Sequence, residues 1–489
     1  MKIDKIKEFT KNRNNQLFLL IIIIAVLIRG YYFYTTLDQP LWWDEAEYMM
    51  MAKSMAFDIE HHFEAVRPVL FSFISALWFK VVGYSELFPR FLMFLLSIIT
   101  VMYTYLLGKT IYNEKVGLIA SSLMAVSPLS LFFTTRLLVD LPSLCFFTVA
   151  GYYFYNYIKT ENNKNLYTAF IITGIGTLFR ITTAVILIVV LIYLILTEKL
   201  SFLKKKEYWI GVTIFILILL PYIIWGYIMF KGFVITKAGA VNAPTEPIKQ
   251  GFQVLINYIK LFPYYFSWLG VVILTIGLIS LYKIFIGLDL IIKNKAPELN
   301  KELFIFLLFI VPFIFLSFSI NHNEDRYIIN SFPGILIISG LALTKLEKFI
   351  KEKYSIISKI AIIIIIIFIA VTQIKVADKT IEVKKDSYSQ IKEAGLFLKE
   401  NTPIDAVIVT SSIPQIELYS ERKIIQMPGT KEDLDKIRKD YNNVYLLFSA
   451  FEKSPNYVYS YPQENKLQLV HTIFLDKEKK QPLVVAYKL

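Results

Sequence analysis

The sequence predicts a polytopic α-helical membrane protein of about eleven spans, followed by a small C-terminal extracytoplasmic α/β domain. Of its 489 residues, 56% are apolar or aromatic and only 19% are charged, with a mean hydropathy of +0.53. A soluble domain usually carries about a quarter charged residues. Apolar runs long enough to cross a bilayer recur through residues 1–374, whereas after residue 374 they shorten to the length of strands.

Cysteine content and charge exclude several classes of protein. The single cysteine, Cys145, rules out an intramolecular disulfide bond, a cysteine zinc site and an iron–sulfur cluster. The formal net charge of +13 could indicate a nucleic-acid partner. However, most of the excess cations lie between the apolar runs, as expected for loops that face anionic lipid and the cytoplasm. The sequence has no basic–aromatic ribbon suited to stacking bases, so we expect no nucleic-acid partner.

Eleven apolar runs are candidates for membrane spans, because a hydrocarbon layer of about 30 Å needs roughly 17 to 25 helical residues. The candidates cover residues 17–36, 87–107, 116–133, 141–158, 166–179, 181–196, 208–230, 261–286, 303–320, 327–343 and 360–374. Tyrosine and tryptophan flank several of their ends, which is typical of anchoring at the membrane interface.

A shorter apolar segment decides the predicted topology. Residues 69–82 are too few to cross the membrane, so we expect a helix at the interface or half-inserted. With this segment excluded, the loops richest in lysine and arginine fall in the cytoplasm together with the N-terminus. The loop 37–68, the turns 136–140 and 321–326, and the chain after residue 374 are then extracytoplasmic. We therefore expect a multi-pass protein of the cell membrane, with a membrane domain at 1–374 and an extracytoplasmic domain at 375–489.

The last 115 residues have the pattern of a small α/β domain. Strands are expected at 406–410, 444–448 and 483–486, and helices at 388–400 and 431–441. The segment has neither a nucleotide-binding loop nor a cluster with metal-ligand spacing, so its sequence assigns it no function.

The first external loop contains the most informative polar stretch. Asp44, Glu45 and Glu47 lie within four residues of one another, next to two tryptophans and just beyond the first span. On a helix, Asp44 and Tyr48 share a face. A carboxylate beside a low-dielectric surface has a raised proton affinity, which suits a general base near neutral pH. The alternative is a helix N-terminus, where acidic residues interact favourably with the macrodipole.

Further along this loop, Arg67 precedes a proline at the predicted membrane surface. A guanidinium there can bind a lipid phosphate through two hydrogen bonds. The alternative is that its side chain only extends to the headgroups. The neighbouring residues 60–64 contain two histidines and two glutamates, but their spacing matches no strong metal motif, so we expect a solvated loop.

Two external turns gather further ionisable residues. Arg136 and Asp140 lie four residues apart at the mouth of two spans, where they either pair with each other or belong to a functional site. The turn before the tenth span contains His322, Glu324, Arg326 and Tyr327.

Together these residues resemble the GT-C superfamily of glycosyltransferases that use polyprenyl-phosphate sugars. Within it they are most similar to the branch of protein O-mannosyltransferases and lipid A aminoarabinose transferases. The resemblance runs from about residue 17 to residue 343. It is carried by Asp44-Glu45 with Tyr48, Arg67-Pro68, Gly83-Tyr84-Ser85-Glu86 with Pro89-Arg90, Ser127-Pro128 with Arg136 and Asp140, and His322-Asn323-Glu324 with Arg326-Tyr327 and Pro333.

The resemblance implies a hexosyltransferase or related glycosyltransferase that moves a sugar from a polyprenyl-phosphate donor to a hydroxyl of a protein, glycan or lipid. It assigns Asp44 to activating the acceptor or lying beside the anomeric carbon, with Glu45 assisting and Asp140 completing an acidic site. Arg67 and Arg326 would hold the donor phosphate. The remaining substrate-binding candidates are Tyr48, Arg136, His322, Glu324 and Tyr327. A base on one side of the sugar and cations on the other predict inversion at the anomeric carbon.

Two departures from the family pattern affect the donor site. Asn323 stands where the family has a lysine, and Val66 stands where the aminoarabinose branch has a glutamate proposed as a metal ligand. Because arginine can meet the developing phosphate charge, we expect no required cofactor. A divalent metal ion stays open as an alternative without support in the sequence.

Two other classes of function stay open. A transporter would place ionisable residues near the bilayer midplane and broken helices in matched halves, whereas here the predicted charges gather at one face. A membrane sensor or scaffold whose external domain binds a ligand would keep its activity in cells without the carboxylate of Asp44.

Overall fold

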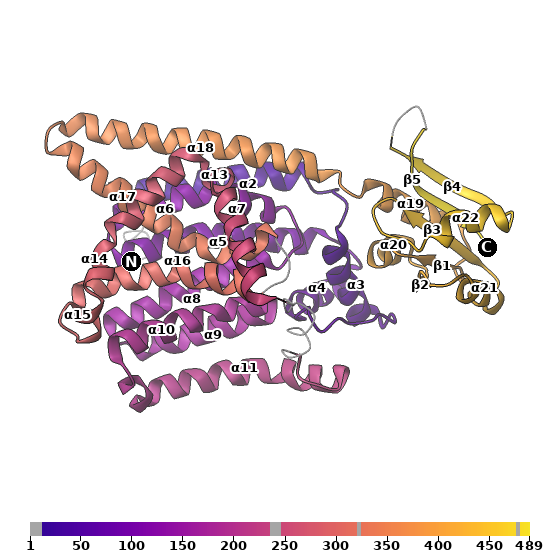
Figure 1. Ribbon diagram of the computed structural model, residues 1–489, viewed down its shortest axis with the longest axis horizontal. Coiled ribbons are helices and arrows are strands. Elements are labelled where there is room, and N and C mark those ends of the chain that lie inside the picture. The colour runs from indigo at the N-terminus through magenta and orange to yellow at the C-terminus, as the bar shows by residue number, and fades with distance from the viewer. Residues whose placement is uncertain (1–11, 235–245, 320–323, 476–479) are drawn as a thin grey trace. The chain divides into compact units, whose positions relative to one another are not determined.

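The computed structural model describes residues 12–234, 246–319, 324–475 and 480–489. Contacts divide the chain into two compact units (Figure 1). The first comprises Met1–Leu37, Phe63–Phe71 and Glu86–Ile381, and the second comprises Asp38–His62, Ser72–Ser85 and Glu382–Leu489. The expected division at residue 374 stays a prediction, because these units follow packing rather than the course of the chain through a membrane.

The first unit is helical, and most of its long helices run roughly parallel or antiparallel to one another (Figure 1). The α-helices are α2 (Arg13–Thr35), α5 (Leu87–Ile111), α6 (Glu114–Ala125), α7 (Pro128–Thr134), α8 (Asp140–Thr160), α9 (Asn163–Phe179), α10 (Val185–Glu198), α11 (Lys206–Phe230), α13 (Pro247–Ser280), α14 (Tyr282–Ile286), α15 (Leu288–Ile292), α16 (Asn300–Ser319), α17 (Phe332–Lys351) and α18 (Ser355–Lys385). Short 3₁₀ helices are η1 (Ile181–Ala184), η2 (Ser201–Lys204), η3 (Pro297–Leu299) and η4 (Asp325–Ser331).

The multi-pass membrane architecture is confirmed. Among the described residues, 8 helical segments are long and apolar enough to cross a bilayer, and a 9th results if α6 and α7, bent by 56°, form one span. The other two expected spans lie in α8 and α9, which are helical but fall outside these criteria. The count of eleven therefore stays a prediction. The segment expected at the interface forms α4 (Leu70–Val82), whose 13 residues are too few for a span.

A fully buried arginine stabilises the bend between α6 and α7. Arg29 of α2 is 0% exposed. Its guanidinium donates to the carbonyl oxygens of Ala125 at 2.8 Å and Met124 at 3.4 Å, at the C-terminus of α6. It also donates to the hydroxyls of Ser97 in α5 and Ser130 in α7. A cation at a helix C-terminus satisfies carbonyls that lack an intrahelical partner and opposes the negative end of the macrodipole.

Replacing Arg29 with methionine is expected to lower the thermal stability of the protein in detergent. The Met124 carbonyl would keep the backbone N–H of Ser127 as a donor at 3.3 Å, so the loss falls on the Ala125 carbonyl, and a buried carbonyl without a donor costs about 1–3 kcal/mol. Arg29→Lys should recover only part of the loss, because one ammonium group cannot reach several acceptors as a planar guanidinium does. Arg13→Met, which removes an exposed cation from the same helix, is the matched control. Equal melting temperatures for the Arg29 and Arg13 variants would contradict this role.

Helix α13 is broken near its middle. Ser267 has φ 60° and ψ 162°, outside the helical region. Its hydroxyl accepts the backbone N–H of Gly270 at 3.2 Å, which caps the second half of the helix. In the amide orientation that satisfies its hydrogen bonds, Gln373 of α18 accepts the Ser267 N–H at 2.7 Å and donates to the Tyr265 carbonyl. Backbone groups freed by a break inside a membrane domain need such partners.

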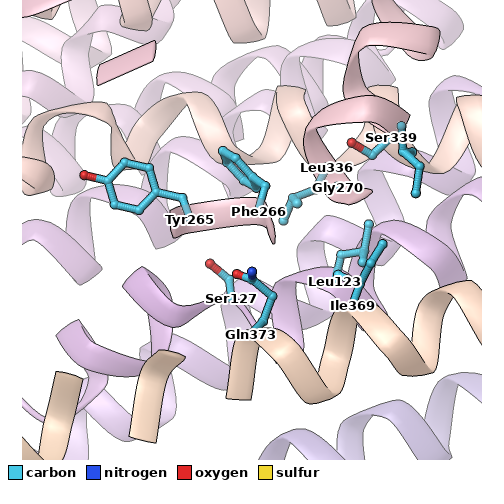
Figure 2. Close-up of a pocket in the computed structure, with 10 residues that line it drawn as sticks. Leu123, Ser127, Tyr265, Phe266, Gly270, Leu336, Ser339, Ile369 and Gln373 are labelled. Carbon is cyan, nitrogen blue, oxygen red and sulfur yellow. The ribbon is translucent and has the colours of Figure 1, made fainter. Parts of the chain in front are cut away.

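A pocket adjoins this break (Figure 2). It is lined by Leu123, Ser127, Tyr265, Phe266, Gly270, Ile273, Leu336, Ser339, Ile369 and Gln373. In Figure 2 the polar ends of Ser127 and Gln373 are directed toward the broken stretch of α13. The lining contains neither a cation nor a carboxylate, so this pocket is not suited to binding a sugar phosphate.

The second unit combines Asp38–His62 and Ser72–Ser85 with the C-terminal α/β domain. Its helices are α3 (Trp43–Phe57), most of α4, α19 (Ser389–Asn401), α20 (Ile413–Ser420), α21 (Lys431–Asp440) and α22 (Tyr457–Glu464). Its strands are β1 (Val407–Thr410), β2 (Lys423–Gln426), β3 (Val444–Ser449), β4 (Gln468–Phe474) and β5 (Pro482–Lys488).

The five strands form one mixed sheet in the order β2-β1-β3-β5-β4. Strands β2, β1 and β3 are parallel, while β5 is antiparallel to both β3 and β4. Alternate residues of β1 enter two different cores. Ile408 packs with Ile391 of α19 and Ile416 of α20, and Val409 packs with Leu434 of α21 and Val458 of α22. Helices therefore cover both faces of the sheet, and the expected α/β class is confirmed.

Candidate functional site

A buried ion pair forms the centre of the polar cluster in the first unit. Asp140 is the first residue of α8 and is 1% exposed. Its carboxylate pairs with the guanidinium of Arg180, which follows the last residue of α9 and has an extended backbone. The Arg180 Nε also donates to the hydroxyl of Thr182 at 3.1 Å. The ends of two helices thus place opposite charges together.

Two guanidinium groups approach one tyrosine ring. Arg180 lies 5.4 Å and Arg326 lies 5.5 Å from the ring centroid of Tyr327. Arg326 is held by Glu324, with an Nε–Oε2 distance of 2.6 Å and a second hydrogen bond of 3.2 Å. The structure therefore brings Asp140, Glu324, Arg326 and Tyr327 into one cluster. The two guanidinium groups of the cluster are held in place by carboxylates, and such cations bind an anionic phosphate through charge-assisted hydrogen bonds.

A network of hydroxyl and amide groups holds the elements of this cluster together. Asn330 of η4 is 1% exposed and donates to Ser143 of α8 at 3.0 Å and to the carbonyl oxygen of Thr182 at 3.4 Å. Thr183 donates to Ser143 at 2.9 Å. These contacts join α8, η1 and η4, the three elements that carry or adjoin Asp140, Arg180 and Tyr327, so the network fixes their spacing.

Arg136 lies in the connection between α7 and α8 and is 1% exposed. Its guanidinium lies 5.8 Å from the ring centroid of Phe132. The preceding residue, Thr135, accepts a hydrogen bond of 3.3 Å from Arg90 of α5. Arg90 in turn pairs with Glu86 at 2.6 Å. The Glu86 and Arg90 motif residues therefore brace the connection that carries Arg136.

Arg67 pairs with a residue of its own loop. Its Nε lies 2.9 Å from the carboxylate of Glu64, and its side chain is 11% exposed. A donor phosphate at Arg67 would compete with this partner. His322, the remaining candidate of the donor site, lies outside the described residues.

In the second unit, the predicted catalytic carboxylates lie in the first turn of α3. The Glu45 carboxylate accepts the backbone N–H of Trp42 at 2.7 Å, which is the contact that the third helical residue makes in a capping box. Asp44 is partly exposed, whereas Glu45 is 0% and Tyr48 is 5% exposed. The helix N-terminus that the sequence offered as an alternative is therefore present. It does not exclude a catalytic role for Asp44.

His61 corrects one expectation about the first external loop. Residues 60–64 are not simply a solvated loop, because the His61 side chain is 5% exposed. Its Nε2 lies 2.9 Å from Glu47 and its Nδ1 lies 3.2 Å from Glu417. Burial lowers the pKa of His61, but hydrogen bonds to Glu417 and Glu47 outweigh that effect and raise the pKa to about 9. The pattern of a loop cannot reveal this, since Glu417 lies more than 350 residues away.

Within the described ranges, His, Cys, Asp and Glu form no group of three or more that could hold a metal ion.

Arg180 is the main functional candidate that the sequence interpretation missed. A lone cation between two apolar runs was a usable signal, since ionisable residues in membrane domains are functional candidates by default.

Comparison with known proteins agrees with the fold. Residues 66–225, about a third of the chain, match the family described as dolichyl-phosphate-mannose-protein mannosyltransferase. This segment includes Arg67, Arg136, Asp140 and Arg180. An uncharacterized protein of Aquifex aeolicus is 26% identical over 282 residues, which cover 56% of this chain and 52% of that protein. The chain thus spans about half the length of this curated relative.

Two solved structures share the architecture. ArnT from Cupriavidus metallidurans bound to undecaprenyl phosphate matches with a TM-score of 0.69 and 11% identity, over 96% of this chain and 97% of that one. The oligosaccharyltransferase AglB from Archaeoglobus fulgidus, in complex with an inhibitory peptide and a dolichol-phosphate, matches with a TM-score of 0.65 and 12% identity, over 90% and 70%. The fold that the GT-C resemblance of the sequence implies is therefore confirmed.

Proposed function

We propose that this protein is a membrane glycosyltransferase that moves a sugar from a polyprenyl-phosphate donor to an acceptor hydroxyl at the extracytoplasmic face of the membrane. The observation that carries the proposal is the pair of guanidinium groups at Tyr327 beside the buried carboxylate of Asp140. Fixed cations in a low-dielectric setting stabilise the charge that develops on a leaving phosphate. The matched mannosyltransferase family and the shared fold support the same reaction class.

The proposed reaction is a single displacement. The acceptor oxygen forms a bond to the anomeric carbon while the bond from that carbon to the phosphate oxygen breaks. The hydroxyl proton passes to the Asp44 carboxylate, and the polyprenyl phosphate leaves as an anion. Attack opposite the leaving group inverts the anomeric configuration. General-base catalysis of this kind contributes about 10²–10⁴-fold.

In this proposal, Arg180, Arg326 and Arg67 hold the donor phosphate, and Asp140 and Glu324 orient the first two cations. The remaining substrate-binding candidates are Tyr48, Arg136, His322 and Tyr327. Because guanidinium groups supply the positive charge, we propose that the reaction needs no divalent metal ion. The sugar acceptor is a protein, glycan or lipid, and the N-terminus lies in the cytoplasm.

Incubation of the purified protein with a panel of polyprenyl-phosphate sugars tests the proposal. Dolichyl and undecaprenyl carriers are each offered with several sugars, together with candidate acceptors, with and without EDTA. Release of free polyprenyl phosphate that requires an acceptor, and persists in EDTA, is the expected result. Proton NMR of the product should give the anomer opposite to that of the donor. A retained configuration would refute single displacement, and the absence of turnover across the panel would refute the function.

A further inference from the structure

The segment that carries Asp44 is held by α20 of the C-terminal domain. At its start, the backbone N–H of Leu41 donates to the hydroxyl of Tyr419 at 2.8 Å. At the far end of α3, the Lys53 ammonium lies 3.1 Å from Glu421, the residue that follows α20. We call the contacts between residues 38–61 and the elements α19 and α20 the α3–α20 interface.

A histidine joins the middle of the α3–α20 interface. His61 bridges Glu47 in the second turn of α3 and Glu417 of α20, at 2.9 Å and 3.2 Å. A fourth contact comes from α19, where the Lys392 ammonium donates to the carbonyl oxygen of Asp38 at 2.9 Å. The contacts therefore cover α3 from the residues before its N-terminus to its last turn.

The α3–α20 interface contains buried charged residues of α3 that need partners. Glu47 and Lys53 are each 5% exposed. A buried charge is strongly destabilising without a partner. Lys53 pairs with Glu421 of the C-terminal domain and also lies 5.1 Å from the ring centroid of Tyr84, while Glu47 pairs with His61, which in turn contacts Glu417 of that domain. Leu41 is 0% exposed, so its N–H also needs an acceptor within the protein. The orientation of the first turn of α3 thus depends on Tyr419.

We infer that the C-terminal domain positions the catalytic helix α3 through the α3–α20 interface, with Tyr419, Glu417 and His61 as positioning residues for the reaction at Asp44. This inference rests on the proposed function only where it names the reaction. It assigns a role to a domain whose sequence contains no catalytic motif. A misplacement of about 1 Å at a reacting group can cost 10²-fold in rate, so a domain that fixes one helix can control turnover without touching the substrate.

The interface also predicts a pH dependence. Two carboxylates face His61, Glu47 from α3 and Glu417 from α20. The protonated imidazole donates to both. Since the pKa of His61 is raised to about 9, the bridge is complete below the ordinary pKa of histidine, about 6.5, and is lost as the pH rises through 9.

Steady-state kinetics and hydrogen exchange of two variants test the inference. Tyr419→Phe removes one acceptor without changing charge, and His61→Asn removes the bridge. We expect each to lower kcat about tenfold with little change in the KM for the lipid donor. The alkaline loss of activity near pH 9 should disappear in His61→Asn. Amide exchange in residues 43–57 should increase in both variants, a readout that needs no substrate.

The matched control is Lys431→Met, which breaks the Lys431–Glu464 ion pair between α21 and α22 of the same domain. It should keep the wild-type kcat, pH profile and exchange in α3. Unchanged exchange in α3 for both Tyr419→Phe and His61→Asn would overturn the inference and leave the glycosyltransferase proposal intact. Increased exchange in a protein that turns over no donor would instead refute the proposed function while the positioning of α3 stands.

Discussion

Replacing Asp44 with asparagine should lower the rate of sugar transfer by about 10²–10⁴-fold, the usual contribution of a general base. The amide has nearly the same shape as the carboxylate but cannot accept the proton of the acceptor hydroxyl. The loss should appear in kcat, because donor binding is proposed to depend on the arginine cluster of the first unit. Release of polyprenyl phosphate from saturating donor is the measurement.

The neighbouring carboxylate, Glu45, tests whether the second acidic residue of this turn assists the chemistry or only caps the helix. Glu45→Gln keeps an oxygen that can accept the Trp42 N–H and so keeps this contact at the start of α3. Glu45→Ala removes the cap and should cost about 1 kcal/mol of stability. If Glu45 only caps α3, then Glu45→Gln retains nearly full activity. If Glu45 also assists the chemistry, its glutamine variant loses activity at unchanged melting temperature. Full activity of Asp44→Asn would remove Asp44 from the mechanism.

The helices and the central strands could be predicted from the sequence because their burial requires continuous runs of apolar residues, which are visible along the chain. A span must be apolar over its whole length, so every candidate run falls mainly on helical residues. Four of the runs extend over two successive helical elements: α6 and α7, η1 and α10, α13 and α14, and η4 and α17. Strands β1 and β3 are covered by helices on both faces and therefore read as continuous apolar runs. Most of the expected boundaries agree with the structure within a few residues, but α13 begins at Pro247 rather than at residue 261, and α18 continues to Lys385 rather than ending at residue 374.

The edge strands left no comparable signal. In β2 the first and last residues are exposed and the two between them are half-buried. In β4 all residues but one are half-buried or exposed. A sequence of mixed polarity such as Gln468–Phe474 is stabilised as a strand by pairing with β5, and this partner cannot be recognised from local pattern. Edge strands of this kind depend on tertiary context rather than on propensity.

The candidate site was predicted in part for a related reason. Ionisable residues at the ends of apolar runs identified Asp140, Arg326 and Tyr327 as candidates. The ion pair of Asp140 with Arg180 could not be predicted, because the two residues lie 40 positions apart in the sequence. The contacts of His61 with Glu417 were equally hidden. Spacing along the chain identifies residues that share an element, whereas a site assembled from several elements depends on how those elements pack.

Replacing Arg180 is expected to affect stability and activity together, and a second substitution separates the two effects. Arg180→Gln removes the cation that pairs with Asp140, which is 1% exposed. Breaking a buried ion pair on one side costs about 3–5 kcal/mol, so a lower melting temperature in detergent should accompany the loss of transfer. The double variant Asp140→Asn with Arg180→Gln removes both charges and should recover most of the stability.

Activity should not recover in the double variant. Losing one group that stabilises developing charge typically costs about 10²–10³-fold in rate, and neither amide can bind phosphate as a cation does. Arg326→Gln provides an independent comparison, because its partner Glu324 is 42% exposed and an exposed pair adds little stability. It should therefore fold normally and still lose transfer. A double variant that regains wild-type turnover would make Arg180 a purely structural residue, and the donor phosphate would then have to bind elsewhere.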